Sequence, residues 1–485
     1  MDQAVAVLLN FPPPGGFADD AQYHSAAQSH VLEVEKLTAK ADFNKSYAAQ
    51  LLDHVNPALN SISYLSLLLA VRGANSLPQA DLLAKFSVFL CTFDARQIRY
   101  RSSAFSVVLD LLASGSLFPA SVAVDLLTTA LLRLDPTGSV LTPHHVALVK
   151  LAYTTDAVEP ALPLLEKDII FYPGVKGLLE TRPLSDPDLP PAAYMNREPG
   201  VQKSLSHSDI LEYDLLRALC FIQRRAWRQA FDALERVLTY PARDSHSCSK
   251  IMVEAHNKWI LVGLLLNGKV PTMPATMAAG AQKSLAALGK PYQSIGKAFE
   301  ENTAESLKAE YESLGAQFFS QENNLNLMRL VMQHYQRWQI LNLRQVYTKI
   351  SLEQIRARTQ SAETAAPLAT EAEIEKLVQE MIDEGMLSGV IERPDGGLAH
   401  LIFVSPNEEL SEAEFAQKMM RTAQRLKELE PLVKAASERL GTSRDYIKYL
   451  AGQQKKEKDG WRDYDASFVN TVEDEDLMTG VVAGY

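Results

Sequence analysis

The sequence predicts an all-α protein: a TPR-like α-solenoid of helical repeats, then a winged-helix module with a small β-hairpin, then C-terminal helices. Three patterns indicate this fold class. Amphipathic helical periods follow one another from about Ser46 to Phe319, separated by short turns. A helix that begins at Thr370 leads into a hairpin turn. After Pro406, apolar residues recur at alternating spacings of four and three.

Length and composition predict two or three domains with a sizeable core, because 485 residues include 47% apolar and only 22% charged side chains. The expected segments are a variable N-terminal segment over 1–45, the helical-repeat domain over 46–322, the winged-helix part over 323–405, C-terminal helices over 406–454 and an acidic disordered tail over 455–485. Arg182–Gly200 contains five prolines and no periodicity. We therefore expect it to be a surface insertion within the repeats.

The repeat unit is clearest in Leu215–Ala242, where a short turn joins two apolar helices and Pro241 ends the second. A similar phrase occupies Leu148–Ile169. Aligning Ala161 with Ala230 gives an offset of 69 residues, close to two periods of ~34 residues. Such units bury their apolar faces only by stacking on their neighbours, so the pattern favours a solenoid.

Two helices are expected next, over residues 324–335 and 337–350, followed by a third after Ser351. Ser351 with Gln354, and Thr370 with Glu373, have the spacing of capping boxes. The Thr370 helix has one apolar face, and Gly385 can end it. That face consists of Ile374, Leu377, Val378, Met381 and Ile382. A turn over Arg393–Gly397 then joins strands expected at Gly389–Glu392 and Leu398–Val404, which completes a winged helix.

Charge argues against DNA binding by this module. The formal net charge of the chain is −11, and Thr370–Leu387 carries six acidic residues against the single basic Lys376. A DNA-binding surface needs positive charge to meet the phosphates. A winged-helix DNA-binding regulator is therefore a distant alternative.

An exposed hairpin edge can instead accept a strand from another protein. The alternative is that the module only caps the last helices of the solenoid. The residues predicted to form the interacting winged-helix edge are Val390, Ile391, Leu398, His400, Ile402 and Val404.

The stretch after Pro406 predicts a long helix with an apolar seam that needs a partner helix. The seam positions are Phe415, Met419, Thr422, Leu426, Leu429, Val433, Ala436 and Leu440. The residues predicted to bind the partner are Phe415, Met419, Leu426, Leu429, Val433 and Leu440. Pro431 predicts a kink or a break into two helices, and Gly441 is expected to close the segment.

The sequence predicts no catalytic, cofactor or metal site. Gly263–Val270 reads G-x-x-x-x-G-K, but a phosphate-binding loop needs Ser or Thr after the lysine, and Gly268 is better interpreted as a helix C-cap. His246 and Cys248 lie two apart without a second ligand pair. Three cysteines without paired spacing, and no apolar run of 18 residues, lead us to expect a protein of the cytoplasm and nucleus.

Helical repeats followed by a winged helix resemble the PCI family, whose members occur in the proteasome lid, the COP-9 signalosome and a translation initiation factor. Asn342–Thr359 and Glu371–Leu398 are similar to that family's C-terminal module nearly position by position. Four further phrases resemble the signalosome branch: Gln97–Phe105, Val158–Ile169, Lys258–Val270 and Gly289–Phe299. The resemblance covers roughly residues 80–440 and is poor over the first 60 residues, the proline-rich stretch and the tail.

The resemblance implies a non-catalytic scaffold. The signalosome removes the ubiquitin-like Nedd8 from cullins of cullin–RING ubiquitin ligases, through a metalloprotease subunit whose H-x-H motif is missing here. Its PCI subunits associate through winged-helix edges, and their C-terminal helices join one bundle, so the implied partners are other subunits and, indirectly, neddylated cullin–RING ligases. Neither nucleic acid nor a membrane is implied. A PCI subunit of the proteasome lid or of the initiation factor is the alternative, which the phrases before residue 300 disfavour.

Overall fold

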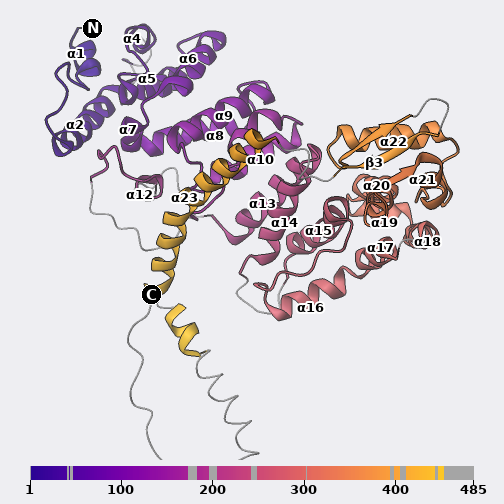
Figure 1. Ribbon diagram of the computed structural model, residues 1–485. Coiled ribbons are helices and arrows are strands. Elements are labelled where there is room, and N and C mark those ends of the chain that lie inside the picture. The colour runs from indigo at the N-terminus through magenta and orange to yellow at the C-terminus, as the bar shows by residue number, and fades with distance from the viewer. Residues whose placement is uncertain are drawn as a thin grey trace, which may run out of the picture. The chain divides into compact units, whose positions relative to one another are not determined.

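Helices dominate the protein, as the sequence predicts (Figure 1). The structure is a computed structural model that describes residues 2–40, 43, 47–172, 183–195, 205–241, 248–301, 303–393, 398–404, 411–442 and 446–452. The chain divides into two compact units, Met1–Met381 and Ile382–Tyr485. Among the residues just given, no helix is long and apolar enough to cross a membrane.

The first part of the unit Met1–Met381 consists of helices of up to 19 residues. Its elements up to the proline-rich stretch are α1 (Asp2–Leu9), α2 (Asp20–Thr38), α4 (Ala48–His54), α5 (Ser61–Ala74), α6 (Gln79–Thr92), α7 (Ala95–Ile98), the 3-10 turn η1 (Arg99–Arg101), α8 (Ser102–Ala113), α9 (Ala120–Leu134), α10 (Pro143–Thr154), η2 (Glu159–Ala161) and α11 (Leu162–Leu165). The first two helices belong to the folded core, since Leu8 and Val34 are fully buried.

The second half of this unit begins within the proline-rich stretch. Its elements are α12 (Pro191–Met195), α13 (His207–Gln223), α14 (Trp227–Thr239), α15 (Lys250–Asn267), α16 (Ala279–Leu288), α17 (Lys290–Glu300), α18 (Ala304–Leu314), α19 (Ala316–Gln321), α20 (Leu325–Leu343), the strand β1 (Lys349–Ser351), α21 (Leu352–Arg358) and α22 (Glu371–Asp383). α22 extends two residues beyond the unit boundary.

The helix pairs stack as the repeat pattern predicts. α14 packs against α13 on one side and α15 on the other, and the three lie side by side in Figure 1. Ala230 of α14 is fully buried, so its small side chain lets the neighbouring helix come close. Phe231 stacks on Trp259 of α15 with ring centroids 5.4 Å apart. Each helix thereby covers the apolar face of the next.

Side-chain caps explain where several helices begin. Ser206 and Asp209 form a reciprocal capping box at α13, with the Ser206 hydroxyl accepting from the Asp209 amide. The capping residues predicted at Ser351 and Thr370 are confirmed, since their hydroxyls accept from the amides of Gln354 at 3.2 Å and Glu373 at 3.3 Å. These bonds satisfy amides that the helix itself leaves unpaired.

The two helices expected over 324–335 and 337–350 are wrong as separate elements. The first and most of the second form one continuous helix, α20, because no proline or glycine interrupts the chain between Tyr335 and Arg337. The end of the second is the strand β1. A strand of three residues has no periodic signal, and its identity depends on pairing with a distant segment.

The sequence predicts that Arg182–Gly200 is a surface insertion, and the predicted exposure is wrong for the described part, residues 183–195, which we call the proline-rich strap. Seven of its side chains are almost completely buried. They are Leu184, Ser185, Leu189, Ala192, Ala193, Tyr194 and Met195. Residues 196–200 lie outside the described residues. Prolines remove helical periodicity but say nothing about exposure, and here they lie in a segment of turns and one short helix, α12, that packs on the core.

Two arginines hold the strap. The Arg99 guanidinium donates to the carbonyls of Asp186 at 2.8 Å and Leu184 at 3.2 Å, and lies 3.9 Å over the Tyr194 ring. Arg96 donates to the Ser185 carbonyl. Strap carbonyls that would otherwise be buried without donors are therefore paired by side chains from α7 and η1.

The second unit contains β2 (Gly389–Glu392), β3 (His400–Phe403) and α23 (Glu412–Thr442). The predicted hairpin is confirmed: β2 and β3 pair antiparallel, with Val390 opposite Ile402. The three strands have the order β1-β3-β2 in one small sheet. Of the predicted turn Arg393–Gly397, residues 394–397 lie outside the described residues. Gly385, with φ +73°, follows α22, as expected for a left-handed helix end.

α23 is one helix of 31 residues that runs through Pro431 (Figure 1). Of the two outcomes predicted there, a kink or a break into two helices, the break is therefore wrong. A proline removes one main-chain hydrogen bond, and the ladder continues on both sides of it. The helix ends at Thr442, one residue beyond the predicted closing residue Gly441. Residues 446–452 are helical, and the predicted disordered tail 455–485 lies outside the described residues.

Candidate functional site

The predicted hairpin residues gather mostly on one face. Val390 and Ile402 are register partners, and so are Glu392 and His400, and such pairs share a face. Leu398 and Val404 flank β3 with the same parity. Val390 is 54% exposed and Leu398 51%. The exception is Ile391, which pairs with the fully buried Leu401 on the opposite face.

The hydrogen bonds of the hairpin determine which backbone groups face outward. The Val404 amide donates to the Ser388 carbonyl at 3.0 Å. Bonded and non-bonded pairs alternate in antiparallel strands, so Val390–Ile402 and Glu392–His400 are the next bonded pairs. The amides and carbonyls of Gly389 and Ile391 therefore point away from β3, along the outer edge of β2.

β2 is an edge strand of the described sheet, whereas β3 is its middle strand. A docking strand would hence bond to β2, through Gly389 and Ile391. The predicted residues of β3, His400 and Ile402, can take part only through side chains on the shared face.

The predicted seam residues of α23 are all exposed. The exposed fractions of Phe415, Met419, Leu426, Leu429, Val433 and Leu440 lie between 44% and 65%. Single exposed apolar residues are ordinary, but a continuous stripe of large ones marks an interaction surface. The helix of 31 residues is ~46 Å long. It thus presents an apolar stripe along most of its length.

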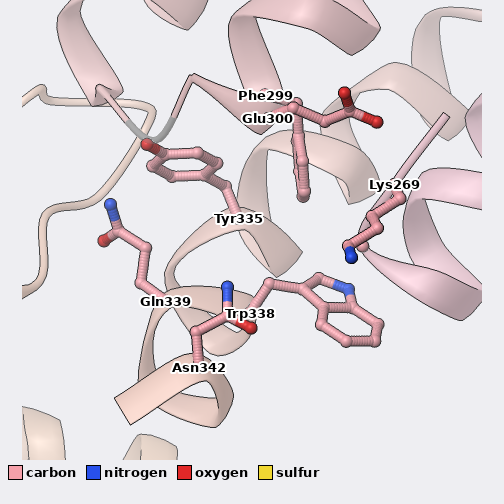
Figure 2. A pocket seen from close by; sticks show the side chains of 8 residues that line it. Lys269, Phe299, Glu300, Tyr335, Trp338, Gln339 and Asn342 are labelled. Atoms are coloured by element: carbon pink, nitrogen blue, oxygen red, sulfur yellow. The ribbon is translucent and has the colours of Figure 1, made fainter. Parts of the chain in front are cut away.

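A pocket of about 300 Å³ lies where α15 ends, between α17 and α20 (Figure 2). Its aromatic lining is Phe299, Tyr335 and Trp338, with the rings of Phe299 and Tyr335 in an edge-to-face arrangement 5.2 Å apart. Lys269 and Glu300 add charges. The Glu300 carboxylate accepts a hydrogen bond from the Val270 amide at 2.6 Å, so it already has a main-chain partner.

This pocket adjoins the G-x-x-x-x-G-K phrase, and its geometry is not that of a phosphate-binding loop. Gly268 has φ +65°, and its amide donates to the Leu264 carbonyl at 3.0 Å, which is the predicted helix C-cap. The residues before it are helix rather than strand. A Cβ at Gly268 would meet the Trp338 ring at 2.5 Å, so glycine is required for this helix end to approach α20.

Three of the histidines buried in the helical core, His30, His145 and His256, have a shifted pKa. Burial lowers the pKa of His30 and His256 to about 4 and that of His145 to about 3, so all three are neutral at pH 7. His30 forms a hydrogen bond with the Ser63 hydroxyl at 2.8 Å, His145 with the hydroxyl of Thr142 at 2.8 Å, and His256 with the Asn257 side chain. Within the described part of the chain, no cluster of three His, Cys, Asp or Glu could hold a metal ion.

The repeats of this chain match a family model described as COP9 signalosome complex subunit 3, N-terminal helical repeats, over residues 24–182 and 194–279. A COP9 signalosome complex subunit 3 from Neurospora crassa is 46% identical over the full length of both chains. The chain belongs to the COP9 signalosome subunit 3 family.

More distant subunit 3 relatives agree with this membership. One from Emericella nidulans is 26% identical over 83% of each chain, and one from Dictyostelium discoideum is 26% identical over 64% of this chain and 65% of its own. As a subunit of a multi-subunit complex, a member of the subunit 3 family has other signalosome subunits as partners.

The subunit 3 similarity reaches further than the sequence phrases suggested. The expected limits of roughly residues 80–440 are too narrow, since the family model begins at residue 24 and the Neurospora relative matches throughout. The family model is interrupted between residues 182 and 194, which coincides with most of the proline-rich strap. No local pattern marked the strap as structural, because the side chains that hold it come from a segment about 90 residues earlier.

Proposed function

We propose that this signalosome subunit is a non-catalytic scaffold. In this proposal, its complex removes Nedd8 from the cullins of cullin–RING ligases, and another subunit supplies the metalloprotease chemistry. The chain would reach neddylated ligases only through the assembled complex. The observation that carries the proposal is the exposed apolar seam of α23, because a seam of six large exposed apolar side chains along one face of a helix needs a covering partner.

The hairpin supports a second assembly surface. We infer that α20, β1, α21, α22 and the hairpin form the winged-helix part of a PCI domain. The outward amides and carbonyls of Gly389 and Ile391 suit the addition of a strand from a neighbouring PCI subunit. The exposed Val390 and Leu398 would then add apolar side-chain contacts beside the new strand.

Charge supports protein rather than nucleic-acid partners. α22 has acidic residues at its start and no basic residue in its last turn. Its single lysine, Lys376, lies 4.0 Å from Glu380. Such a helix would repel phosphates. The cysteines Cys91, Cys220 and Cys248 are all free, which agrees with the reducing environment of the cytoplasm and nucleus that we propose.

The seam is tested by co-expressing the full-length chain with the other signalosome subunits and weighing the complexes by native mass spectrometry. Leu426→Asp should weaken incorporation about tenfold or more, since it loses an apolar contact of about 2 kcal/mol and places a charge in the bundle. Met420→Asp is the matched control, because Met420 is 69% exposed but lies off the seam. Equal incorporation of both variants would overturn the scaffold role of the seam.

The edge is tested separately with Ile391→Pro. Proline removes the outward amide but leaves the bonded pairs with β3 intact, so the hairpin should persist while strand addition weakens. Ile402→Pro would instead remove a bond within the hairpin and report on folding. Charge reversal at Lys376 on α22 is expected to have little effect. If the Ile391 variant and the charge-reversal variant assembled equally well, docking through the β2 edge would be excluded.

A further inference from the structure

The pocket between α15, α17 and α20 has an aromatic wall that is ordered before any ligand arrives. Phe299 is 4% exposed and Tyr335 1%, and their edge-to-face packing fixes both rings. The Trp338 ring is fixed on its other side by Gly268, where an added Cβ would meet it at 2.5 Å. A ligand that packs on a preformed wall does not have to order these side chains as it binds.

The rim of the pocket carries three exposed polar side chains, Lys269, Glu300 and Asn342. The Glu300 carboxylate accepts from the Val270 amide and points away from the Tyr335 ring in Figure 2. Lys269 instead extends toward the Trp338 ring in the same view. Within the part of the chain that the structure describes, the side chains of Lys269 and Asn342 have no hydrogen-bond or ion-pair partner. The rim therefore offers an unpaired ammonium and an unpaired amide.

A third unpaired group belongs to the aromatic wall. The Trp338 indole nitrogen is shielded from solvent and has no acceptor among the described residues. Figure 2 shows the nitrogen-bearing edge of this ring turned toward the end of Lys269. An indole N–H and an ammonium can only donate, and a shielded donor without an acceptor is unfavourable. One acceptor group placed between Lys269 and the indole edge would satisfy both.

Charge restricts that acceptor to a single carboxylate. α15 ends at Asn267 and α17 at Glu300, so the ends of two helices lie at the pocket. Helix C-termini carry partial negative charge, and the Glu300 carboxylate adds to it. A phosphate group, with up to about two negative charges, would face this field with only Lys269 to offset it. A carboxylate has one charge, which one lysine can pair.

The size and the rim indicate where the carboxylate comes from. A volume of about 300 Å³ lies at the lower end for ligand pockets, so one aromatic ring with a short acidic arm would fill it. The Asn342 amide has both donors and an acceptor, which suits the peptide group of a bound main chain.

We propose that this pocket binds a peptide segment of another protein in which an aromatic residue adjoins Asp or Glu. The ring packs on Phe299 and Trp338, and the carboxylate accepts from Lys269. The site uses neither the seam of α23 nor the edge of β2, so this inference goes beyond the proposed scaffold role.

A fluorine NMR titration of the full-length chain tests the chemistry. The probe is N-acetyl-para-fluorophenylalanyl-aspartyl-amide, which should bind with a dissociation constant on the order of 1 mM. Its neutral asparagine analogue should bind about threefold to fivefold more weakly, as expected for an exposed ion pair. Lys269→Gln should abolish this difference. Lys283→Gln, which removes an exposed lysine of α16 outside the pocket, should preserve it.

A second probe, para-fluorophenylpropionate, separates a peptide from a free small molecule, because it has the ring and the carboxylate but no peptide group. It should bind more weakly than the aspartyl peptide. Asn342→Leu, which favours the helix, should weaken the peptide by about threefold and leave the free acid unchanged.

Equal binding of the aspartyl and asparaginyl peptides would overturn the inference, and so would equal losses in the Lys269 and Lys283 variants. Tighter binding of the free acid than of the peptide would overturn the peptide source and assign the pocket to a small aromatic acid. No other subunit is present in these titrations, so their failure would leave the scaffold proposal to the Leu426→Asp experiment.

Discussion

Replacing Arg99 by alanine should release the proline-rich strap from the N-terminal helices. The change removes donors from two strap carbonyls and a cation lying 3.9 Å over the Tyr194 ring. Hydrogen bonds from a charged group contribute about 1.5–3 kcal/mol each when well shielded, and a cation over an aromatic ring about 0.5–2 kcal/mol. Because Arg99 is only partly buried, we take about 3 kcal/mol in total.

The loss of binding energy should appear as local opening of the strap rather than as global unfolding, because the strap is a short segment that can detach without unfolding the helices beneath it. A change of about 3 kcal/mol raises the open fraction on the order of a hundredfold. Hydrogen exchange detects it at the Ala193 amide, which donates to the Pro190 carbonyl at 2.9 Å. Exchange there should accelerate by about that factor, while amides of α14 and α15 keep their protection.

The matched control is Arg224→Ala, which removes an arginine paired with Glu159 at the surface, where both side chains are about half exposed. Such a pair contributes at most about 1 kcal/mol. Arg99→Lys should be intermediate, because an ammonium keeps the charge but cannot span both carbonyls in the same way. Unchanged exchange at Ala193 in Arg99→Ala would refute the view that this arginine holds the strap.

Three further outcomes are expected. First, burial depresses the pKa of His30 and His256 to about 4 and of His145 to about 3, below the unfolded value of 6.5, so unfolding takes up protons as the pH falls. Thermal stability should therefore be level above pH 6.5 and decline toward pH 4, by up to about 1.4 kcal/mol per pH unit for each histidine. A flat profile would contradict the burial of these histidines in the neutral form. Second, a Cβ at Gly296 would meet a Val270 methyl at 2.2 Å, so Gly296→Ala should cost about 1–3 kcal/mol in urea unfolding, and Val270→Ala should recover part of it in the double variant. Third, Ser351→Ala should cost about 1 kcal/mol by removing the cap of α21, whereas an equal loss in Ser351→Thr would show that the hydroxyl is not responsible.

Features that depend on neighbours a few residues away were predictable. The caps at Ser351 and Thr370, the apolar face of α22 and the presence of the hairpin arise from contacts within four residues or across one tight turn. The exposed seam of α23 is of the same kind, since its heptad spacing is complete within one helix. Propensity, capping and periodicity act over this range.

Tertiary structure decided the rest. Arg96 and Ser185 are 89 residues apart, and no local signal links a guanidinium to a distant carbonyl, so the sequence predicts an exposed insertion where the structure has a buried strap. The identity of β1 depends on a partner strand remote in the chain, and only the order of the sheet shows that β2 rather than β3 forms the hairpin's free edge. Pairings between distant segments cost loop-closure entropy, so they form only when many other tertiary contacts form with them. A short window of sequence does not contain the residues that make those other contacts.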